Sequence, residues 1–282
     1  MKRVCPLLER ETATTTLAIA PPPWVVRECR ESGFVFLENP PGYDSLRAEV
    51  AWEVSSARES ERRAAAEPAL YALSTAAKRF RLRVLKRNKV ADLAVAIVRR
   101  LRAPQIRLLD VGCGEGTLLG TVMDRLPDAL RARCRPLGIE ISDELARRSQ
   151  AALAAYGGQC VHASALDGLA GLAPHSLDLI VLASFLEHEI QPLPLLRECA
   201  RTLRAGGRVI VKVPNYASWN RRLRGTRWCG YRWPDHVNYF TPATLAAAAR
   251  AAGLEVVRMN AFDRLPISDS LYAVLGPLAN TA

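Results

Sequence analysis

The sequence lacks any apolar run that approaches the ~18 to 20 residues needed to span a membrane as a helix. At the N-terminus, Glu9 and Glu11 occur before an apolar signal-peptide core could form. The 282 residues contain no internal repeat and no low-complexity tract. These absences argue against a transmembrane protein and a repeat array, so we predict a packed globular protein of the cytoplasm.

Cysteine and lysine are both scarce. The seven cysteines are an odd number and are scattered, which does not suit a disulfide framework in a chain of this length. We therefore expect reduced thiols. Only five of the 39 basic residues are lysine, and the formal net charge is +11. This balance indicates an anionic partner, although net charge bears on association and solubility rather than on the fold.

The chain divides into three parts by composition. Residues 1–45 carry the breakers "APPPW" and "NPPGY" and two β-like runs, "WVVREC" and "GFVFLE", which predict a loop-rich head. Residues 46–102 are rich in alanine, leucine, glutamate and arginine, which predicts two or three helices. In residues 103–282 apolar runs alternate with amphipathic stretches, a pattern typical of βαβ units and a parallel sheet.

The expected elements of this α/β region follow from its apolar periodicity. Buried strands are expected at 106–111, 134–139, 159–162, 177–182 and 208–213, with an edge strand at 254–260. Helices are expected at 117–126, 143–156, 193–203 and 242–252.

A glycine-rich turn follows the first buried strand, in "IRLLDVGCGEGTLL". Glycine has no Cβ, so such a loop lets a ligand lie against the backbone amides at the start of the next helix. A plain tight turn is the alternative interpretation. A Walker A loop is excluded because Gly116 is not followed by Lys-Ser or Lys-Thr, and the spacing differs from the G-x-G-x-x-G of dinucleotide folds.

Four ordered stretches, "LLDVGCGEG", "LGIEIS", "SLDLIVLASFLEHE" and "TLRAGGRVIVKVPN", resemble the class I S-adenosyl-L-methionine-dependent methyltransferases. The resemblance covers residues 102–260 and is to the small-molecule branch of quinone-biosynthesis-like and polysaccharide-associated enzymes. It implies S-adenosylmethionine as the cofactor. It also implies a Rossmann-like, doubly wound, mostly parallel sheet with helices on both faces, preceded by the head and the helical segment.

The resemblance also implies a set of cofactor-binding residues. Asp110 would orient the loop and the amino-acid end of the cofactor, and Glu140 would take both ribose hydroxyls. Ile141 would line the adenine edge. Ser164 and Ala165 stand where the family usually has an aspartate for the adenine amine, so a backbone amide could serve there instead. The methionine part would lie along the loop residues Gly112, Cys113, Gly114 and Gly116.

His188 and His236 are the candidates for acid–base catalysis among the four histidines. His188 follows the fourth strand of the sheet, where the resembled class I enzymes bring the acceptor close to the methyl group, and packing beneath the cofactor is its alternative role. His236 lies in "YRWPDHVNYFTPATL", part of the acceptor cover in the resembled branch, and it could instead order that loop through Asp235. A neutral histidine can remove a proton from a hydroxyl near pH 7. The aromatic side chains of this segment suit either a flat acceptor or a packed lid: Trp219, Trp228, Tyr231, Trp233 and Tyr239.

The head resembles a zinc ribbon that some members of this branch carry. Its pairs "CPLL" and "CRESG" have Leu8 and Ser32 in place of the second cysteine. A structural zinc site needs four ligands, and Cys5 and Cys29 supply two. We therefore predict a degenerate, zinc-ribbon-like head without metal.

These observations predict an enzyme that transfers a methyl group to a small-molecule acceptor, most simply at a hydroxyl oxygen. One alternative is an RNA methyltransferase or binder that uses the basic run "KRFRLRVLKRNK" at 78–89. Nucleic acid is disfavoured because no "NPPY"-type motif follows the fourth strand. A binding protein without activity is the other alternative. An anionic or lipid-linked acceptor, reached by peripheral membrane contact, stays open.

Overall fold

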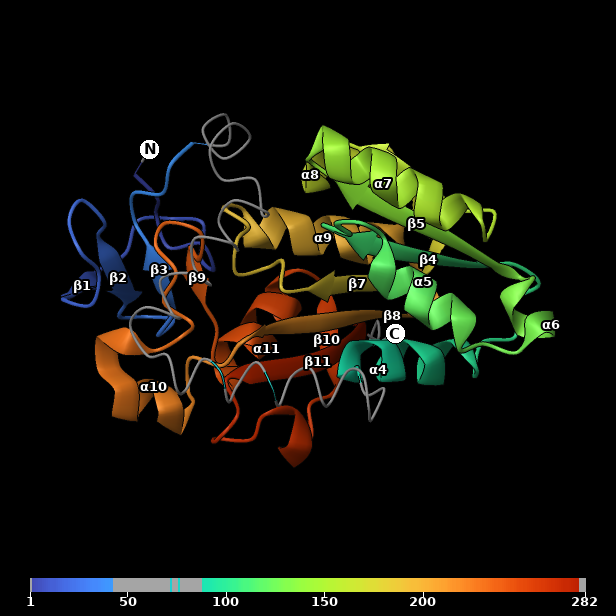
Figure 1. The fold of residues 1–282 in the computed structure, drawn as a ribbon. Helices are drawn as coiled ribbons and strands as arrows, with labels where there is room; N and C mark the ends of the chain where they lie inside the picture. Colours follow the sequence, from blue (N-terminus) through green and yellow to red (C-terminus); the bar gives the residue numbers. More distant parts are fainter. Residues whose placement is uncertain (1, 43–71, 73–75, 77–87, 279–282) are drawn as a thin grey trace.

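The computed structural model describes residues 2–42, 72, 76 and 88–278 (Figure 1). Its centre is a seven-stranded sheet in the order β10-β11-β8-β7-β4-β5-β6. Neighbouring strands from β8 to β6 run parallel, whereas β11 is antiparallel to both β8 and β10. The strands are β4 Ile106–Val111, β5 Cys134–Glu140, β6 Gln159–His162, β7 Leu177–Ala183, β8 Leu203–Pro214, β10 Leu254–Arg258 and β11 Ser270–Pro277.

Helices cover both faces of this sheet. Successive strand side chains point to opposite faces, so Leu179 and Val181 of β7 join one core cluster while Ile180 and Leu182 join the other. The cluster that contains Leu179 and Val181 is covered by α4 Lys89–Val98, α5 Thr117–Asp124 and α7 Asp143–Ala154. The cluster that contains Ile180 and Leu182 is covered by α8 Ala165–Ala170, α9 Pro192–Thr202 and α11 Pro242–Ala251. The short helix α6, Asp128–Arg131, connects α5 to β5.

The predicted α/β fold is confirmed, and two of the local differences concern the main sheet. Leu203 was expected to end a helix, but it begins β8, where it pairs with Leu177 of β7 and has its side chain buried. The antiparallel strand β11 was not predicted, although it lies between β8 and the predicted edge strand β10. Most of the predicted helical segment 46–102, including the basic run up to residue 87, lies outside the described residues.

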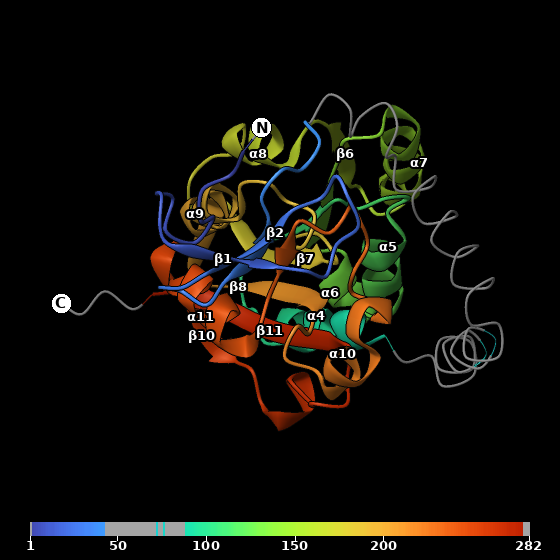
Figure 2. The same ribbon diagram turned by 90° about the vertical axis from the view of Figure 1, so that its left-hand side faces the viewer.

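The head forms a second, antiparallel sheet together with the segment that carries His236. Its strands β1 Thr14–Leu17, β2 Val26–Cys29 and β3 Val35–Leu37 follow one another, and β3 then pairs with β9, Asn238–Tyr239. Figure 1 shows the head at the left end of the molecule, beside the loops that follow β7 and β8. Figure 2 looks onto this end, with β1, β2 and β3 in front of the main sheet. The head therefore lies over one end of the seven-stranded sheet.

Each of the two head cysteines lies close to a hydroxyl side chain, and one of these belongs to Ser32, which stands at a predicted ligand position. Cys5 Sγ is 3.4 Å from Ser32 Oγ, and Cys29 Sγ is 3.3 Å from Thr12 Oγ1. Leu8, in contrast, packs against the apolar core. One predicted ligand position is therefore apolar, and both the zinc-ribbon-like character of the head and its lack of zinc stay predictions.

None of the helices in the described part of the chain is long and apolar enough to cross a membrane.

Candidate functional site

The strand order changes direction at β4. The chain runs outward from β4 through β5 to β6 and then returns to β7 on the other side of β4. In open α/β sheets, ligands bind beyond the carboxyl ends of the strands at such a switch point. Asp110 of β4 pairs with Val181 of β7, so the glycine loop after β4 and the "FLEHE" loop after β7 leave the same edge of the sheet.

The backbone of the glycine loop requires its glycines. Gly112, Gly114 and Gly116 have φ angles of +67°, +55° and +76°, which residues with a Cβ rarely adopt. The amides of Gly112 and Cys113 both donate to the carbonyl of Ile139, at 2.8 and 3.2 Å, and this ties the loop to β5. Gly116 is the N-cap of α5, so the loop presents backbone amides at a helix N-terminus.

Glu140 closes this loop from the end of β5. Its Oε2 accepts a hydrogen bond from the amide of Gly114 at 2.9 Å, and its Oε1 accepts one from the amide of Ser142 at 3.0 Å. A carboxylate oxygen has two lone pairs, so each oxygen keeps one for a ligand hydroxyl. The side chain is thus fixed in place and still able to accept from a pair of hydroxyls.

Asp110 lies directly before the loop and is buried, with 3% of its surface exposed. Burial raises the pKa of its carboxyl from 3.8 to about 8, and the nearby Glu140 and Cys160 add to this rise. A cationic group placed beside Asp110 would favour the ionised form.

Cys113, between the first two glycines, is buried under the loop. Its Sγ lies 3.2 Å from Ser149 Oγ and 3.7 Å from Cys160 Sγ. The side chain therefore packs against α7 and β6, and the amide of Cys113 is tied to Ile139, so a contact of Cys113 with the cofactor stays a prediction.

The adenine-side residues lie at the ends of β5 and β6. Ser164 is the N-cap of α8, where its Oγ accepts from the amide of Asp167 at 3.2 Å and donates to the Asp167 carboxylate at 2.6 Å. Ala165 is buried and Ile141 is half-buried. The hydroxyl of Ser164 is engaged in capping α8, and which group contacts the adenine amine stays a prediction.

Phe185 was missed by the sequence reasoning. An ideal Cβ on Gly112 would lie 2.4 Å from Cδ2 of the Phe185 ring, so the bare glycine is what lets this ring reach the loop. Phe185 precedes Glu187 by two residues and follows Ser184, whose φ is +59°. The ring therefore joins the glycine loop to the loop after β7. A phenylalanine behind a buried strand looks like ordinary core, and no sequence spacing marks it.

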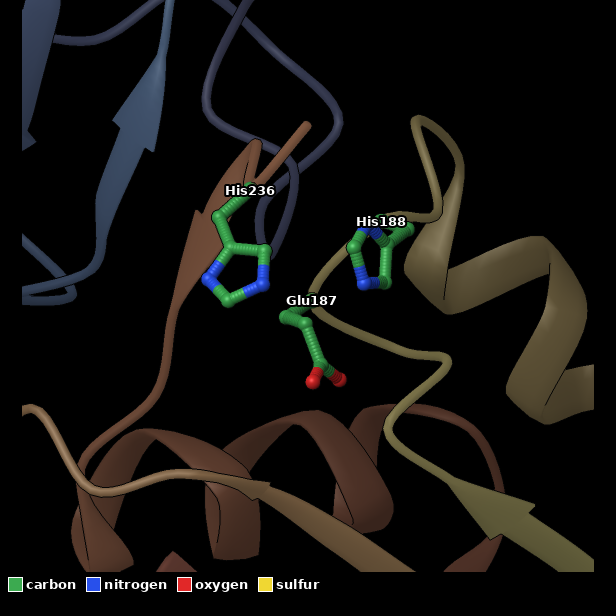
Figure 3. Close-up of side chains that lie close together, drawn as sticks. All are labelled: Glu187, His188 and His236. Atoms are coloured by element: carbon green, nitrogen blue, oxygen red, sulfur yellow. The ribbon is translucent and has the colours of Figure 1, made fainter. Parts of the chain in front are cut away.

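The loop after β7 and the segment before β9 bring together three titratable side chains, Glu187, His188 and His236, here called the acid–base cluster (Figure 3). One candidate ligand or proton-accepting atom from each lies within 4.8 Å of the others. The rings of His188 and His236 meet edge to face with centroids 4.7 Å apart. The structure thus places both predicted histidines at one site and adds Glu187 to them.

Hydrogen bonds fix the tautomer of each ring. His188 Nδ1 lies 2.9 Å from the carbonyl of Asp235, and His236 Nδ1 lies 2.8 Å from the carbonyl of Gly230. A carbonyl accepts only, so each Nδ1 carries the proton and each neutral ring keeps a lone pair on Nε2. Glu187 Oε2 is buried and has no hydrogen-bond partner. The three side chains therefore offer hydrogen-bond acceptor atoms, to which the hydroxyl group of a bound molecule would donate.

Burial controls the charges of this cluster. It lowers the pKa of His188 from 6.5 to about 4 and holds that of His236 well below its usual range, so both rings are neutral at pH 7. Burial also raises the pKa of Glu187 from 4.5 to about 7, although Lys212 and Arg232 oppose this rise. Glu187 therefore changes its protonation near neutral pH.

The same three side chains have residue types that bind transition metals. Two cations oppose a further positive ion, because Lys212 and Arg232 act on both histidines as well as on Glu187. These two cations disfavour a metal ion at the cluster, and the catalytic role of the two histidines stays a prediction.

The aromatic residues of the acceptor cover are mostly packed. Trp228, Tyr231 and Tyr239 are at most 3% exposed and form a cluster with Val35 and Leu37 of the head. Trp219, in contrast, is 54% exposed on α10, Trp219–Arg224. This favours the packed-lid interpretation over a stack of rings open to an acceptor.

The fold and the site together define a Rossmann-like protein with a ligand loop of the methyltransferase type. Residues 72–259 match the family model described as "Methyltransferase domain", and the chain belongs to this family. A curated relative from Cupriavidus pinatubonensis, a ubiquinone biosynthesis O-methyltransferase, is 28% identical over 57% of this chain and 65% of its own length. Another of that name, from Xanthomonas euvesicatoria, is 30% identical over 56% of this chain and 66% of its own. The chain thus matches just under two thirds of each relative's length.

Solved structures agree on the fold. The CcbJ methyltransferase from Streptomyces caelestis has a TM-score of 0.51 over 66% of this chain and 94% of its own, at 19% identity. An S-adenosylmethionine-dependent methyltransferase from Mesorhizobium loti has a TM-score of 0.50 over 65% of this chain and 96% of its own, at 18% identity.

Proposed function

We propose that the chain is an S-adenosylmethionine-dependent methyltransferase that transfers a methyl group to a hydroxyl oxygen of a small-molecule acceptor. The observation that carries this proposal is the position of the glycine loop, which is bound by Glu140, at the same edge of the sheet as the acid–base cluster. The side chains of this cluster offer hydrogen-bond acceptor atoms. The name of the curated relatives, ubiquinone biosynthesis O-methyltransferase, supports oxygen as the methylated atom.

The residues present fit this cofactor. The bare glycine backbone gives room beside the amides of the loop, and Glu140 keeps lone pairs for two ribose hydroxyls. Asp110 would accept the positively charged amino group, and Ile141 would line the adenine. When bound, the cofactor supplies a methyl group on a positively charged sulfur.

The remaining chemistry falls to side chains that hold and deprotonate the acceptor. His188 and His236 hold their Nε2 lone pairs in fixed directions, because each Nδ1 is tied to a carbonyl. We propose that the acceptor hydroxyl donates its proton to this cluster, with Glu187 as the group that stores it near pH 7. Phe185 covers Gly112 between the two halves of the site and would help to exclude water.

The acceptor is sought by its chemistry. The net charge of +11 favours anionic compounds such as nucleotide sugars and phosphate-linked lipid glycans, and the first screen tests these beside neutral phenols and sugars, each with labelled cofactor. Lipid-linked acceptors are presented in anionic vesicles and in detergent, which separates recognition of the acceptor from attraction to the surface. Label in transfer RNA instead would support the RNA alternative, and no incorporation into any acceptor would contradict an active enzyme.

The ribose assignment predicts that Glu140→Ala weakens cofactor binding at least ~10-fold, because two charge-assisted hydrogen bonds are lost and the loop loses its contact at Gly114. Isothermal titration calorimetry measures the change. Glu115→Ala is the matched control, since Glu115 lies in the same loop but is exposed and pairs with Arg148. Equal affinity of Glu140→Ala and the wild type would remove the ribose assignment.

The raised pKa of Asp110 predicts that the stability of the protein and its affinity for the cofactor depend on pH. Below about pH 4 its carboxyl is protonated whether folded or unfolded; between about 4 and 8 only the unfolded chain ionises, so its contribution to stability falls as pH rises. We expect Asp110→Asn to raise Tm by at least ~2 °C at pH 8 and by less at pH 5. We also expect it to weaken cofactor binding at pH 8. A Tm difference that stays constant with pH would contradict the assigned ionisation.

A further inference from the structure

Arg3 is a buried cation that none of the interpretations above uses. It is 7% exposed, and a guanidinium in such a place must have its N–H groups hydrogen-bonded, or burial would cost several kcal/mol. Its Nη1 donates to the carbonyls of Leu37 and Val237 at 3.2 and 3.0 Å. Its Nη2 donates to the carbonyl of Ile190 and to Oδ1 of Asn238, both at 2.8 Å.

These acceptors come from three segments that are far apart in the sequence. Leu37 ends β3 of the head, Ile190 belongs to the loop after β7, and Val237 and Asn238 enter β9. The planar fork of an arginine can hold several acceptors in one fixed geometry, which the single ammonium of a lysine cannot do. Arg3 therefore joins the head to both segments that carry the acid–base cluster.

Asn238 extends this network to the cluster itself. Its Nδ2 donates to the carbonyls of Leu186 and Glu189, at 2.9 and 2.6 Å, on either side of Glu187 and His188. The amides of Val237 and Asn238 both donate to the carbonyl of Glu187, at 2.8 and 3.1 Å. The loop after β7 and the segment after His236 are thus held at a fixed separation.

The head supplies the second support of this arrangement. In the described part of the chain β9 pairs with β3 alone, through Val35 opposite Tyr239 and Phe36 opposite Asn238, and the amide of Leu37 donates to the carbonyl of Val237 at 2.9 Å. The head therefore fixes His236 from one side while Arg3 ties the same segment to His188.

We propose that Arg3 is a positioning residue for methyl transfer, which sets the distance between His188 and His236, and that the head is a working part of the acceptor site. The inference rests on the proposed function for its catalytic consequence, but its structural part stands on the hydrogen bonds alone. A displacement of about 1 Å in a reacting group can cost ~10²-fold in rate.

The test compares Arg3→Met, Arg3→Lys and the control Lys2→Met, which removes a neighbouring charge from an exposed side chain paired with Glu38. Hydrogen–deuterium exchange is measured on peptides that span 186–190 and 235–240. We expect exchange at the Val237 and Asn238 amides to be at least ~10-fold faster in Arg3→Met, intermediate in Arg3→Lys and unchanged in Lys2→Met. Peptides over the glycine loop should exchange as in the wild type.

Turnover gives the second readout. With an acceptor in hand, kcat should fall ~10- to 100-fold in Arg3→Met and recover in part in Arg3→Lys, while cofactor affinity stays within ~2-fold. Unchanged exchange in Arg3→Met would overturn the proposal whatever the activity. Faster exchange with unchanged kcat would overturn its catalytic part. If the wild type methylates nothing, the proposed function fails, and the exchange data still decide whether Arg3 positions the cluster.

Discussion

Gly112→Ala is expected to weaken binding of S-adenosylmethionine at least ~100-fold. The new Cβ would lie 2.4 Å from the Phe185 ring, and the backbone at φ +67° would be strained by about 1 kcal/mol or more. The loop or the ring must move, and either movement displaces the amides that would contact the cofactor. Isothermal titration calorimetry measures the affinity, and a thermal melt measures the stability.

Gly33→Ala is the matched control for this prediction. Gly33 lies in the head with a φ of +65°, and its Cβ would meet nothing within 4 Å. The control therefore carries a similar backbone strain without a clash at the cofactor loop, and we expect a lower Tm with unchanged affinity. Similar affinities of the two variants would show that the Gly112 loop does not contact the cofactor.

Glu187→Gln is expected to lower turnover ~10²- to 10⁴-fold while leaving the protein as stable as the wild type or more so. The substitution removes a buried carboxylate whose pKa is raised to about 7, so its ionisation costs stability as pH rises from about 4.5 to 7. It also removes the group proposed to store the acceptor proton. The wild-type kcat/KM should rise through about pH 7, and this rise should be absent from the variant.

The histidine variants separate the roles within the cluster. His188→Ala and His236→Ala should each lower turnover ~10²-fold without removing the rise near pH 7, because both rings are already neutral there. Glu198→Gln is the matched control for Glu187→Gln, because Glu198 pairs with Arg201 on α9, outside the cluster. Wild-type turnover and pH profile in all three cluster variants would show that positioning by the loop, rather than a base, governs the reaction.

Most of the α/β fold was predictable because its signals are local. Strands β4, β5, β7 and β8 contain apolar runs whose alternating side chains face two helix layers, and Gly253 marks the end of α11 before β10. The antiparallel β11 was not predictable in this way, since its place between β8 and β10 depends on pairing far along the chain. The same holds for β9, a two-residue strand that exists through its pairing with the head.

The sequence marked the glycine loop with Glu140 and two of the three members of the acid–base cluster, His188 and His236, but not Glu187. Gly112 and Glu140 occur in a recognisable order at strand ends, and the structure brings them together. Glu187 and Glu189 flank His188 in the sequence and both are buried, so only the fold, which places Glu187 beside both histidines, distinguishes it. Arg3 looks like one of many surface arginines, and its position between three distant segments follows from the fold of the head.

The most direct test of the account is a calorimetric titration of the wild-type chain with S-adenosylmethionine. The glycine loop, Asp110 and Glu140 predict one binding site per chain with a dissociation constant in the range of about 1 μM to 1 mM. Binding should weaken in Glu140→Ala and in Gly112→Ala but not in Glu115→Ala. Absence of binding to the folded wild-type protein at millimolar cofactor would contradict the proposed methyltransferase activity.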